Sequence, residues 1–183
     1  MELITRLQQQ LQGLEERSLI RRRRTVDTPC APRLTVDGRA MLAFCSNDYL
    51  GLAAHPRIVE ALKEGAGLYG AGSGASHLIS GHSRAHAQLE ERLAAFVGAN
   101  LEQARALYFC TVYMANLAVL TALSAGDPDA EIFSEALNHA SLIDGTRLAR
   151  VKTRVYPHAD LDALAALLAA STATTKIVVT DSV

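Results

Sequence analysis

Apolar residues near the start of the chain recur every three or four positions, from Ile4 through Leu7 and Leu11 to Leu14. Charged residues and glutamines fill the positions between them. An apolar stripe with this period predicts an amphipathic helix. We expect the helix to run into the basic stretch 21–24, where cations would complement the negative end of the helix dipole.

The pattern then changes to short alternating segments. Residues 33–48 read as two strands joined at Asp37-Gly38, a dipeptide that favours a tight hairpin turn. Pro56 opens the next helix, because proline suits the first helical turn. Glycines near the end of this helix are expected to weaken it.

From residue 84 on, helical and strand-like patterns alternate. The predicted elements, in chain order, are a helix after Ser83 whose apolar stripe ends at Val97, a strand at 106–110, a helix at 113–123, a strand at 131–136, a helix at 140–149, a strand at 154–158, a helix at 161–170 and a strand at 176–183. Such alternation predicts an α/β fold with a mostly parallel sheet.

The last predicted strand also ends the sequence. No helix follows to cover it, so we expect these residues to be the first part of a longer protein. In doubly wound sheets, ligands bind beyond the carboxyl ends of the strands, where the loop after this strand would lie.

Composition narrows the class of protein. The 183 residues are 49% apolar, enough for the core of one domain or slightly more, and the net charge of −1 gives no reason to expect nucleic acid as a partner. Cys30, Cys45 and Cys110 are far apart and form no C-x-x-C pair, which argues against a disulfide framework or a zinc knuckle. A polar N-terminus and the lack of a bilayer-length apolar run predict a soluble, cytoplasmic protein with no membrane partner.

The most unusual stretch is GAGSGASHLISGH, residues 70–82. Its glycines loosely match a dinucleotide-binding fingerprint, which requires a strand before the glycines and a helix directly after them. Here a helix precedes them and about ten residues separate them from the next one, which disfavours a nucleotide-binding domain that uses 70–75. Either a flexible surface loop or a loop that passes close to a ligand or another subunit would use so many small residues.

Two charged or polar clusters have competing interpretations. His82, His86 and Glu90 follow a helical spacing, but three ligands in one line cannot surround a metal tetrahedrally, so no metal site is expected. The run Arg21–Arg24 is expected to be solvated, although one arginine turned inward could hold a substrate carboxylate with two hydrogen bonds.

Two strand-to-helix junctions are candidate ligand sites. In FCTVYMAN (109–116), amide groups at the helix start would face an anion, which the helix dipole also favours. In NHAS (138–141), His139 lies at a similar junction, where a lone histidine is more often a helix cap than a catalyst.

Taken together, four segments resemble the α-oxoamine synthases. They are FCSNDYLGLAAHPRI (44–58), GAGSGASHLISGHSRAHAQLEERLA (70–94), FCTVYMANLAVLTAL (109–123) and NHASLIDG (138–145), in the family's order. These enzymes use pyridoxal 5'-phosphate (PLP) and condense an amino acid with an acyl thioester while losing carbon dioxide. The resemblance implies the PLP-dependent transferase fold of type I, here truncated, and a homodimer.

The resemblance also implies roles for particular residues. The turn at Thr111, Val112 and Tyr113 would cradle the cofactor phosphate through backbone amides. His139 would stack on the pyridine ring and orient the substrate, which makes it the catalytic candidate. The substrate side would be lined by residues of the first half of the chain, namely Arg21, which would hold the acyl-chain carboxylate, Asn47 and Ser76.

Two departures from the family pattern bear on activity. Val112 stands where the family usually has glycine, and a β-branched residue with positive φ is strongly disfavoured. If the family's glycine has such a φ, then Val112→Gly should tighten cofactor binding. The family's Schiff-base lysine lies downstream of these residues, and Lys63, Lys152 and Lys176 match none of its motifs.

Within the family, two residues favour a long dicarboxylic acyl group. Leu78 is apolar, as suits a methylene chain, and Arg21 suits a free carboxylate. The expected substrates are therefore L-alanine and a pimeloyl thioester, either pimeloyl-CoA or a pimeloyl-carrier protein. A glycine C-acetyltransferase or a 5-aminolevulinate synthase-like member is the alternative, and a non-catalytic fragment that binds a partner chain is the alternative of another class.

The expected organisation follows from the same resemblance. Residues 1–45 would form an arm with the N-terminal helix and the hairpin. Residues 46–183 would form the first part of the PLP-binding large domain.

Overall fold

A computed structural model describes residues 2–181. Backbone contacts divide the chain into two compact units, residues 1–85 and residues 86–183. The expected division into an arm, residues 1–45, and the first part of a large domain, residues 46–183, concerns the complete fold and remains a prediction.

The first unit begins with the predicted amphipathic helix and hairpin. Helix α1 (Glu2–Glu16) has no buried residue, and all of it except Gly13 and Leu14 is exposed. Strands β1 (Arg33–Val36) and β2 (Arg39–Leu42) pair antiparallel around the predicted turn, where φ is 50° at Asp37 and 73° at Gly38. Two residues with positive φ are what the tightest hairpin turns require.

The rest of this unit holds one long helix and one short one. Helix α2 (Pro56–Tyr69) runs through the glycines that were expected to weaken it and ends before Gly70, whose φ is 78°. Residues 70–76 are irregular, and η1 (His77–Gly81) is a single π-helical turn that the sequence did not predict. Such turns are rare and are often found at functional sites.

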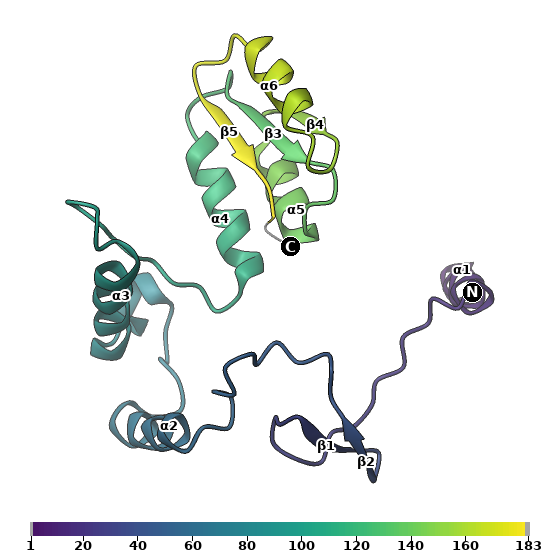
Figure 1. Ribbon diagram of the computed structural model, residues 1–183, viewed down its shortest axis with the longest axis vertical. Helices are drawn as coiled ribbons and strands as arrows, with labels where there is room; N and C mark the ends of the chain where they lie inside the picture. Colours follow the sequence, from purple (N-terminus) through teal and green to yellow (C-terminus); the bar gives the residue numbers. More distant parts are fainter. Residues whose placement is uncertain (1, 182–183) are drawn as a thin grey trace. The chain divides into compact units, whose positions relative to one another are not determined.

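The second unit is the predicted α/β layer structure. It contains α3 (Arg84–Val97), which begins at the division, then α4 (Val112–Ser124), β3 (Glu131–Glu135), α5 (Ala140–Ala149), β4 (Lys152–Tyr156), α6 (Leu161–Ala169) and β5 (Lys176–Val179). The three strands are parallel, in the order β4-β3-β5 (Figure 1).

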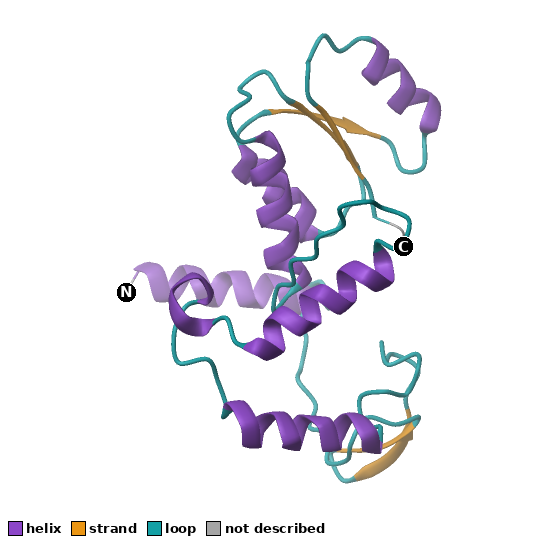
Figure 2. Ribbon diagram, turned by 90° about the vertical axis from the view of Figure 1, so that its left-hand side faces the viewer, coloured by secondary structure: helices purple, strands orange, loops and turns teal. Residues whose placement is uncertain are grey.

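Strand order places the helices on opposite faces of this sheet. The connection through α5 moves from β3 to β4, whereas the connection through α6 moves back across β3 to β5. Because crossovers between parallel strands are right-handed, opposite directions put the two helices on opposite faces. Figure 2 shows α6 on one side of the strands and α4 and α5 on the other.

The core lies between the sheet and the α4–α5 pair. Leu120, Ile132 and Val179 are buried together at its centre. The two helices approach closely at Gly145, where an added Cβ would lie 2.9 Å from Leu120 Cδ1 and 3.1 Å from the carbonyl oxygen of Asn116. A side chain at position 145 would therefore push the helices apart.

Several strand predictions were wrong in detail. Strand β5 ends at Val179, so the predicted strand does not continue through 180–181, and the rest of that prediction lies outside the described residues. Strand β2 ends at Leu42, short of the predicted end at residue 48. Residues 106–110 form no strand, because β-structure needs a paired neighbour and none of the described strands pairs with this segment; Leu107 is exposed. Strand β4 covers residues 152–156 rather than 154–158, and it ends before Pro157, which has no N–H to donate to a ladder.

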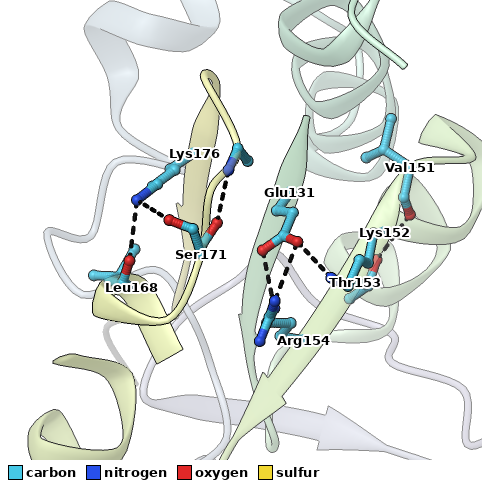
Figure 3. Close-up of polar contacts among 9 residues, drawn as sticks. Glu131, Val151, Lys152, Thr153, Arg154, Leu168, Ser171 and Lys176 are labelled. Carbon is cyan, nitrogen blue, oxygen red and sulfur yellow. Dashed lines mark hydrogen bonds and ion pairs between the residues drawn. The ribbon is translucent and has the colours of Figure 1, made fainter. Parts of the chain in front are cut away.

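Charged side chains around the buried Glu131 order the amino end of the sheet (Figure 3). Glu131 is only 6% exposed and accepts hydrogen bonds from Lys152 Nζ at 2.6 Å and from Arg154 Nε at 2.9 Å. These hydrogen bonds, with that of Lys152 the strongest influence, lower the pKa of the Glu131 carboxyl to about 2. At the same end of the sheet, Lys176 Nζ donates to the carbonyl oxygens of Leu168 and Ser171.

Gly145→Ala tests the helix contact. We expect it to lower the free energy of unfolding by about 1 to 3 kcal/mol, because overpacking against Leu120 and the α4 backbone outweighs the better helix propensity of alanine. Gly65→Ala in α2, where an added Cβ meets nothing within 4 Å, is the matched control and should be neutral or stabilising. Urea denaturation of both variants measures the difference, and equal stability would contradict the close approach.

Glu131→Gln tests the charge cluster. Because the folded state lowers the pKa of Glu131, the carboxylate contributes stability above its ordinary pKa of 4.5, and this contribution is lost as the pH falls toward about 2. The variant should be less stable at neutral pH and should lose less stability between these pH values. Denaturation midpoints against pH measure this, with Glu60→Gln in an exposed ion pair as the control.

Candidate active site

The candidate residues of the second unit gather at the carboxyl end of the sheet. Helix α4 runs back toward the start of β3, so its own first residues lie at the opposite end, where β3 leads into α5 (Figure 1). The loops beyond this end are where open parallel sheets bind ligands. The turn at 111–113 and His139 therefore lie at the same end of the sheet.

Thr111 caps the first turn of α4. Its backbone is extended, with φ −144° and ψ 149°, and its Oγ1 accepts a hydrogen bond from the Met114 N–H at 3.1 Å. The N–H groups of Val112 and Tyr113 come next, and helix geometry leaves such groups without acceptors inside the helix. Together with the helix dipole, they form an electropositive, exposed helix start that favours an anion.

Val112 is the first residue of α4 and has no left-handed strain. It is not among the described non-glycine residues with positive φ. The concern that a β-branched residue would be strained at this position is therefore wrong for this backbone. The reason to expect tighter binding from Val112→Gly disappears with it.

Tyr113 joins α4 to α5. Its hydroxyl donates to Asp144 Oδ2 at 2.6 Å, and Arg147 Nη1 donates to Asp144 Oδ1 at 3.1 Å. The hydrogen bond to Asp144 is the main reason that the pKa of Tyr113 is raised, and partial burial and the carboxylate charge add to it. The phenol consequently stays protonated and holds the start of α4 against α5.

His139 caps α5 with its side chain. Its Nδ1 accepts the Ser141 N–H at 3.2 Å and lies 2.7 Å from Ser141 Oγ. Ser141 Oγ in turn accepts a hydrogen bond from Asn116 Nδ2 of α4 at 2.9 Å. The imidazole is exposed, but one edge of its ring is fixed by these contacts.

Asn138 fixes the backbone just before His139. It is 5% exposed, and its Nδ2 donates to the Val179 carbonyl oxygen at 2.9 Å and to Ser134 Oγ at 3.0 Å. The side chain thereby ties the carboxyl ends of β3 and β5 together. Its Oδ1 is buried and has no partner among the described residues.

The three substrate-side candidates lie in the first unit, each on a different segment. Arg21 follows α1 in an irregular, exposed stretch, and Asn47 is exposed in the loop that Asp48 orders by accepting the Leu52 N–H at 2.8 Å. Ser76 precedes the π-helical turn, and its carbonyl oxygen accepts the Gly81 N–H at 2.9 Å. A Cβ on Gly81 would collide with the Ala75 carbonyl oxygen, so only glycine closes this turn.

The arginine run does not lie at a helix end. Helix α1 stops at Glu16, so the expected complement to the dipole is absent, because the chain leaves the helix before residues 21–24. Arg22 lies 3.8 Å from Glu15, and both side chains are largely exposed. This agrees with the solvated interpretation of the run.

Other ligand chemistry finds little support in residues 2–181. His86 and Glu90 lie on α3, whereas His82 lies before it, and in this part of the chain no three His, Cys, Asp or Glu side chains form a group that could hold a metal ion. None of its helices has the length and apolar character needed to cross a bilayer.

Sequence reasoning missed Asn116, Ser141 and Asp144. Each lies within one of the segments that resembles the family, but no local pattern shows that α4 and α5 bring them into contact. Their positions were the one usable signal for finding them. Asn116 and Ser141 each lie within about one turn of the start of a helix, next to a candidate ligand site.

A known family profile matches most of the chain. Residues 39–183 match the profile of aminotransferase class I and II. The chain belongs to this family. The α/β fold with a parallel sheet that the sequence predicted is the fold of the family, and the predicted fold class is confirmed.

Relatives of high identity are consistent with the resemblance seen in the sequence. The chain is 71% identical over 182 residues to 8-amino-7-oxononanoate synthase of Janthinobacterium sp. (strain Marseille), and 69% identical over 183 residues to that of Bordetella petrii. In both comparisons the alignment covers 100% of this chain and 46% of the relative. The chain therefore spans about half the length of the curated relatives it matches.

Solved structures agree on the fold. Serine palmitoyltransferase of Sphingomonas wittichii superimposes with a TM-score of 0.80 at 24% identity, over 94% of this chain and 42% of that one. An 8-amino-7-oxononanoate synthase from Francisella tularensis superimposes with a TM-score of 0.53 at 26% identity, over 74% of this chain and 43% of that one.

Thr111→Ala tests the helix cap at the candidate site. Loss of the hydrogen bond to the Met114 N–H should lower the free energy of unfolding by about 1 kcal/mol. Thr111→Ser keeps a capping hydroxyl and should stay close to the wild type. Urea denaturation measures both variants, and equal losses in the two would show that the hydroxyl does not cap α4.

Proposed function

We propose that the gene product that carries this sequence is a PLP-dependent acyltransferase that makes 8-amino-7-oxononanoate for biotin synthesis. It would condense L-alanine with a pimeloyl thioester, carried by CoA or by a carrier protein, and release carbon dioxide, as a cytoplasmic homodimer. The observation that supports this most directly is the identity of 71% to a relative of that name over the whole length of the chain.

The geometry at the carboxyl end of the sheet fits PLP. A phosphate dianion suits the exposed amides of Val112 and Tyr113, because they lie at the positive end of a helix that Thr111 caps. Backbone amides bind phosphate whatever the side chain, so valine in place of the family's glycine does not remove this contact. When bound, PLP would supply the electron sink that stabilises negative charge at the amino acid's α-carbon.

His139 is the catalytic candidate for orientation. Its imidazole is exposed at the same end of the sheet and is fixed along the edge that carries Nδ1, so its face and Nε2 remain for the cofactor ring and the substrate. A ring held by hydrogen bonds loses little entropy on contact, which favours precise placement of the reacting groups.

The substrate side draws on the first unit. We assign the acyl-chain carboxylate to Arg21, since a guanidinium binds a carboxylate with two parallel hydrogen bonds. Asn47 and Ser76 are assigned to the same side, and Gly81 fixes the carbonyl of Ser76 within the π-helical turn. Leu78 is 94% exposed and is available to contact a methylene chain.

The lysine that carries PLP is not assigned to these residues. Lys63 is paired with Glu60 and Lys152 with Glu131, and Lys176 donates to two backbone carbonyls at the amino end of the sheet, far from the candidate site. Lys176 is also exposed. Proton transfers by a lysine would therefore come from residues beyond this sequence.

The test is an assay of the purified gene product with PLP, L-alanine and pimeloyl-CoA. We expect release of free CoA and a product with the mass of 8-amino-7-oxononanoate, together with a lysine adduct of PLP that borohydride reduces. Glycine with acetyl-CoA or succinyl-CoA should react much more slowly; preference for either would indicate the alternative family members. PLP binding without turnover or an adduct would indicate a non-catalytic fragment.

Arg21→Ala sharpens the assay. Loss of a charge-assisted pair should raise the KM for pimeloyl-CoA about tenfold or more. Arg23→Ala in the same exposed run is the matched control and should leave KM nearly unchanged. If Arg23→Ala has the larger effect, the carboxylate is held by a different arginine of the run.

A further inference from the structure

Three side chains from the α4–α5 region form a continuous hydrogen-bonded chain at the candidate site. Asn116 Nδ2 of α4 lies 2.9 Å from Ser141 Oγ of α5, and Ser141 Oγ lies 2.7 Å from His139 Nδ1. The Ser141 N–H points to the same nitrogen at 3.2 Å. Ser141 contacts the imidazole of His139 directly, and Asn116 reaches it through Ser141.

The protons that His139 and Ser141 share in these hydrogen bonds can be placed by elimination. A backbone N–H can only donate, so the Ser141 N–H requires a lone pair on His139 Nδ1. A nitrogen that offers a lone pair carries no proton, so this geometry fits the tautomer whose proton is on Nε2. The Ser141 hydroxyl at 2.7 Å then also donates to Nδ1, because two lone pairs at that distance would repel, and it shares the single lone pair of Nδ1 with the backbone N–H.

Asn116 decides the direction of the hydroxyl. Its amide N–H donates to Ser141 Oγ, which leaves the hydroxyl proton for His139. An acceptor at the same position would compete for that proton and turn a hydroxyl lone pair toward Nδ1. Ser141 is fully buried, with 0% exposure, so its hydroxyl depends on these neighbours for its hydrogen bonds.

We propose that Asn116 and Ser141 are positioning residues that hold His139 as the neutral tautomer with its proton on Nε2. The exposed edge of the ring is then a hydrogen-bond donor, suited to an acceptor oxygen such as a carboxylate or carbonyl of the bound substrate. The assignment of that oxygen rests on the proposed function, whereas the tautomer depends only on the contacts within this unit.

The first test is the protonation state of His139. Nitrogen-15 NMR of the gene product labelled at histidine distinguishes the two ring nitrogens, and His139→Gln identifies the resonances. We expect Nδ1 without a proton and Nε2 with one at neutral pH. A proton on Nδ1 in the wild type would overturn the proposal outright, whether or not PLP binds.

Asn116→Asp and Ser141→Ala then test the two positioning residues. The oxygens of the introduced carboxylate can only accept, so this nearly isosteric change at position 116 should raise the population of Nδ1-protonated ring about fivefold or more. Ser141→Ala removes one of two donors and should act in the same direction but less strongly. Ser124→Ala and Thr146→Ala remove buried hydroxyls from the same two helices and are the matched controls.

The PLP dissociation constant separates this inference from the proposed function. If both hold, Asn116→Asp and Ser141→Ala weaken PLP binding about threefold to tenfold and the controls do not. If the variants shift the tautomer but the wild type does not bind PLP, the proposed function fails and the positioning role stands. If all four variants lower stability alike and leave the tautomer unchanged, Asn116 and Ser141 merely join two helices and the inference is wrong.

Discussion

The close packing of α5 against α4 is the contact on which the candidate site depends. Gly145 permits it, because any side chain there would meet Leu120 and the α4 backbone. At this separation, Tyr113 reaches Asp144 at 2.6 Å. A spreading of the helices by about one ångström would break such a hydrogen bond, because its energy falls steeply with distance. Gly145, six residues after His139, thus controls how closely the two helices that carry the candidate residues approach.

Each end of the parallel sheet has a buried, paired carboxylate, but only the carboxyl end also has exposed, incompletely bonded polar groups at the candidate site. At the amino end, Glu131 is saturated by Lys152 and Arg154, which satisfies a buried carboxylate and ties two strands together. At the carboxyl end, Glu135 is likewise buried and paired, with His158 Nδ1 at 2.9 Å. The polar groups of Thr111 and His139 remain partly exposed there, and only their inner edges are bonded. Saturated charges stabilise a fold, whereas incompletely bonded donors can still bind a ligand. The two ends of the sheet are distinct because its three strands are parallel, so every strand begins at the same end.

Much of this arrangement could be predicted from the sequence, and the failures at residues 106–110 and at the Asn116–Ser141 contact have a common cause. Helices α1 to α6 follow from apolar spacing and cap residues, and the hairpin follows from Asp37-Gly38, because these signals are local. The segment 106–110 has the composition of a strand, but a strand needs a partner that composition cannot reveal. The contact between Asn116 and Ser141 was missed for the same reason, since it depends on how two helices pack. Local patterns located the candidate site, but only packing showed how its side chains are oriented.

Val112 illustrates why a departure from a family pattern must be judged on the backbone. Glycine is required where φ is positive or where a Cβ would collide. Neither condition holds at Val112, which is the first residue of a regular helix and is 73% exposed. The amide of residue 112 points along the helix axis with either side chain. Gly81 meets the opposite condition, because a Cβ there would overlap a backbone oxygen. The backbone at position 112 therefore accepts a residue other than glycine, whereas the path of the chain requires glycine at position 81.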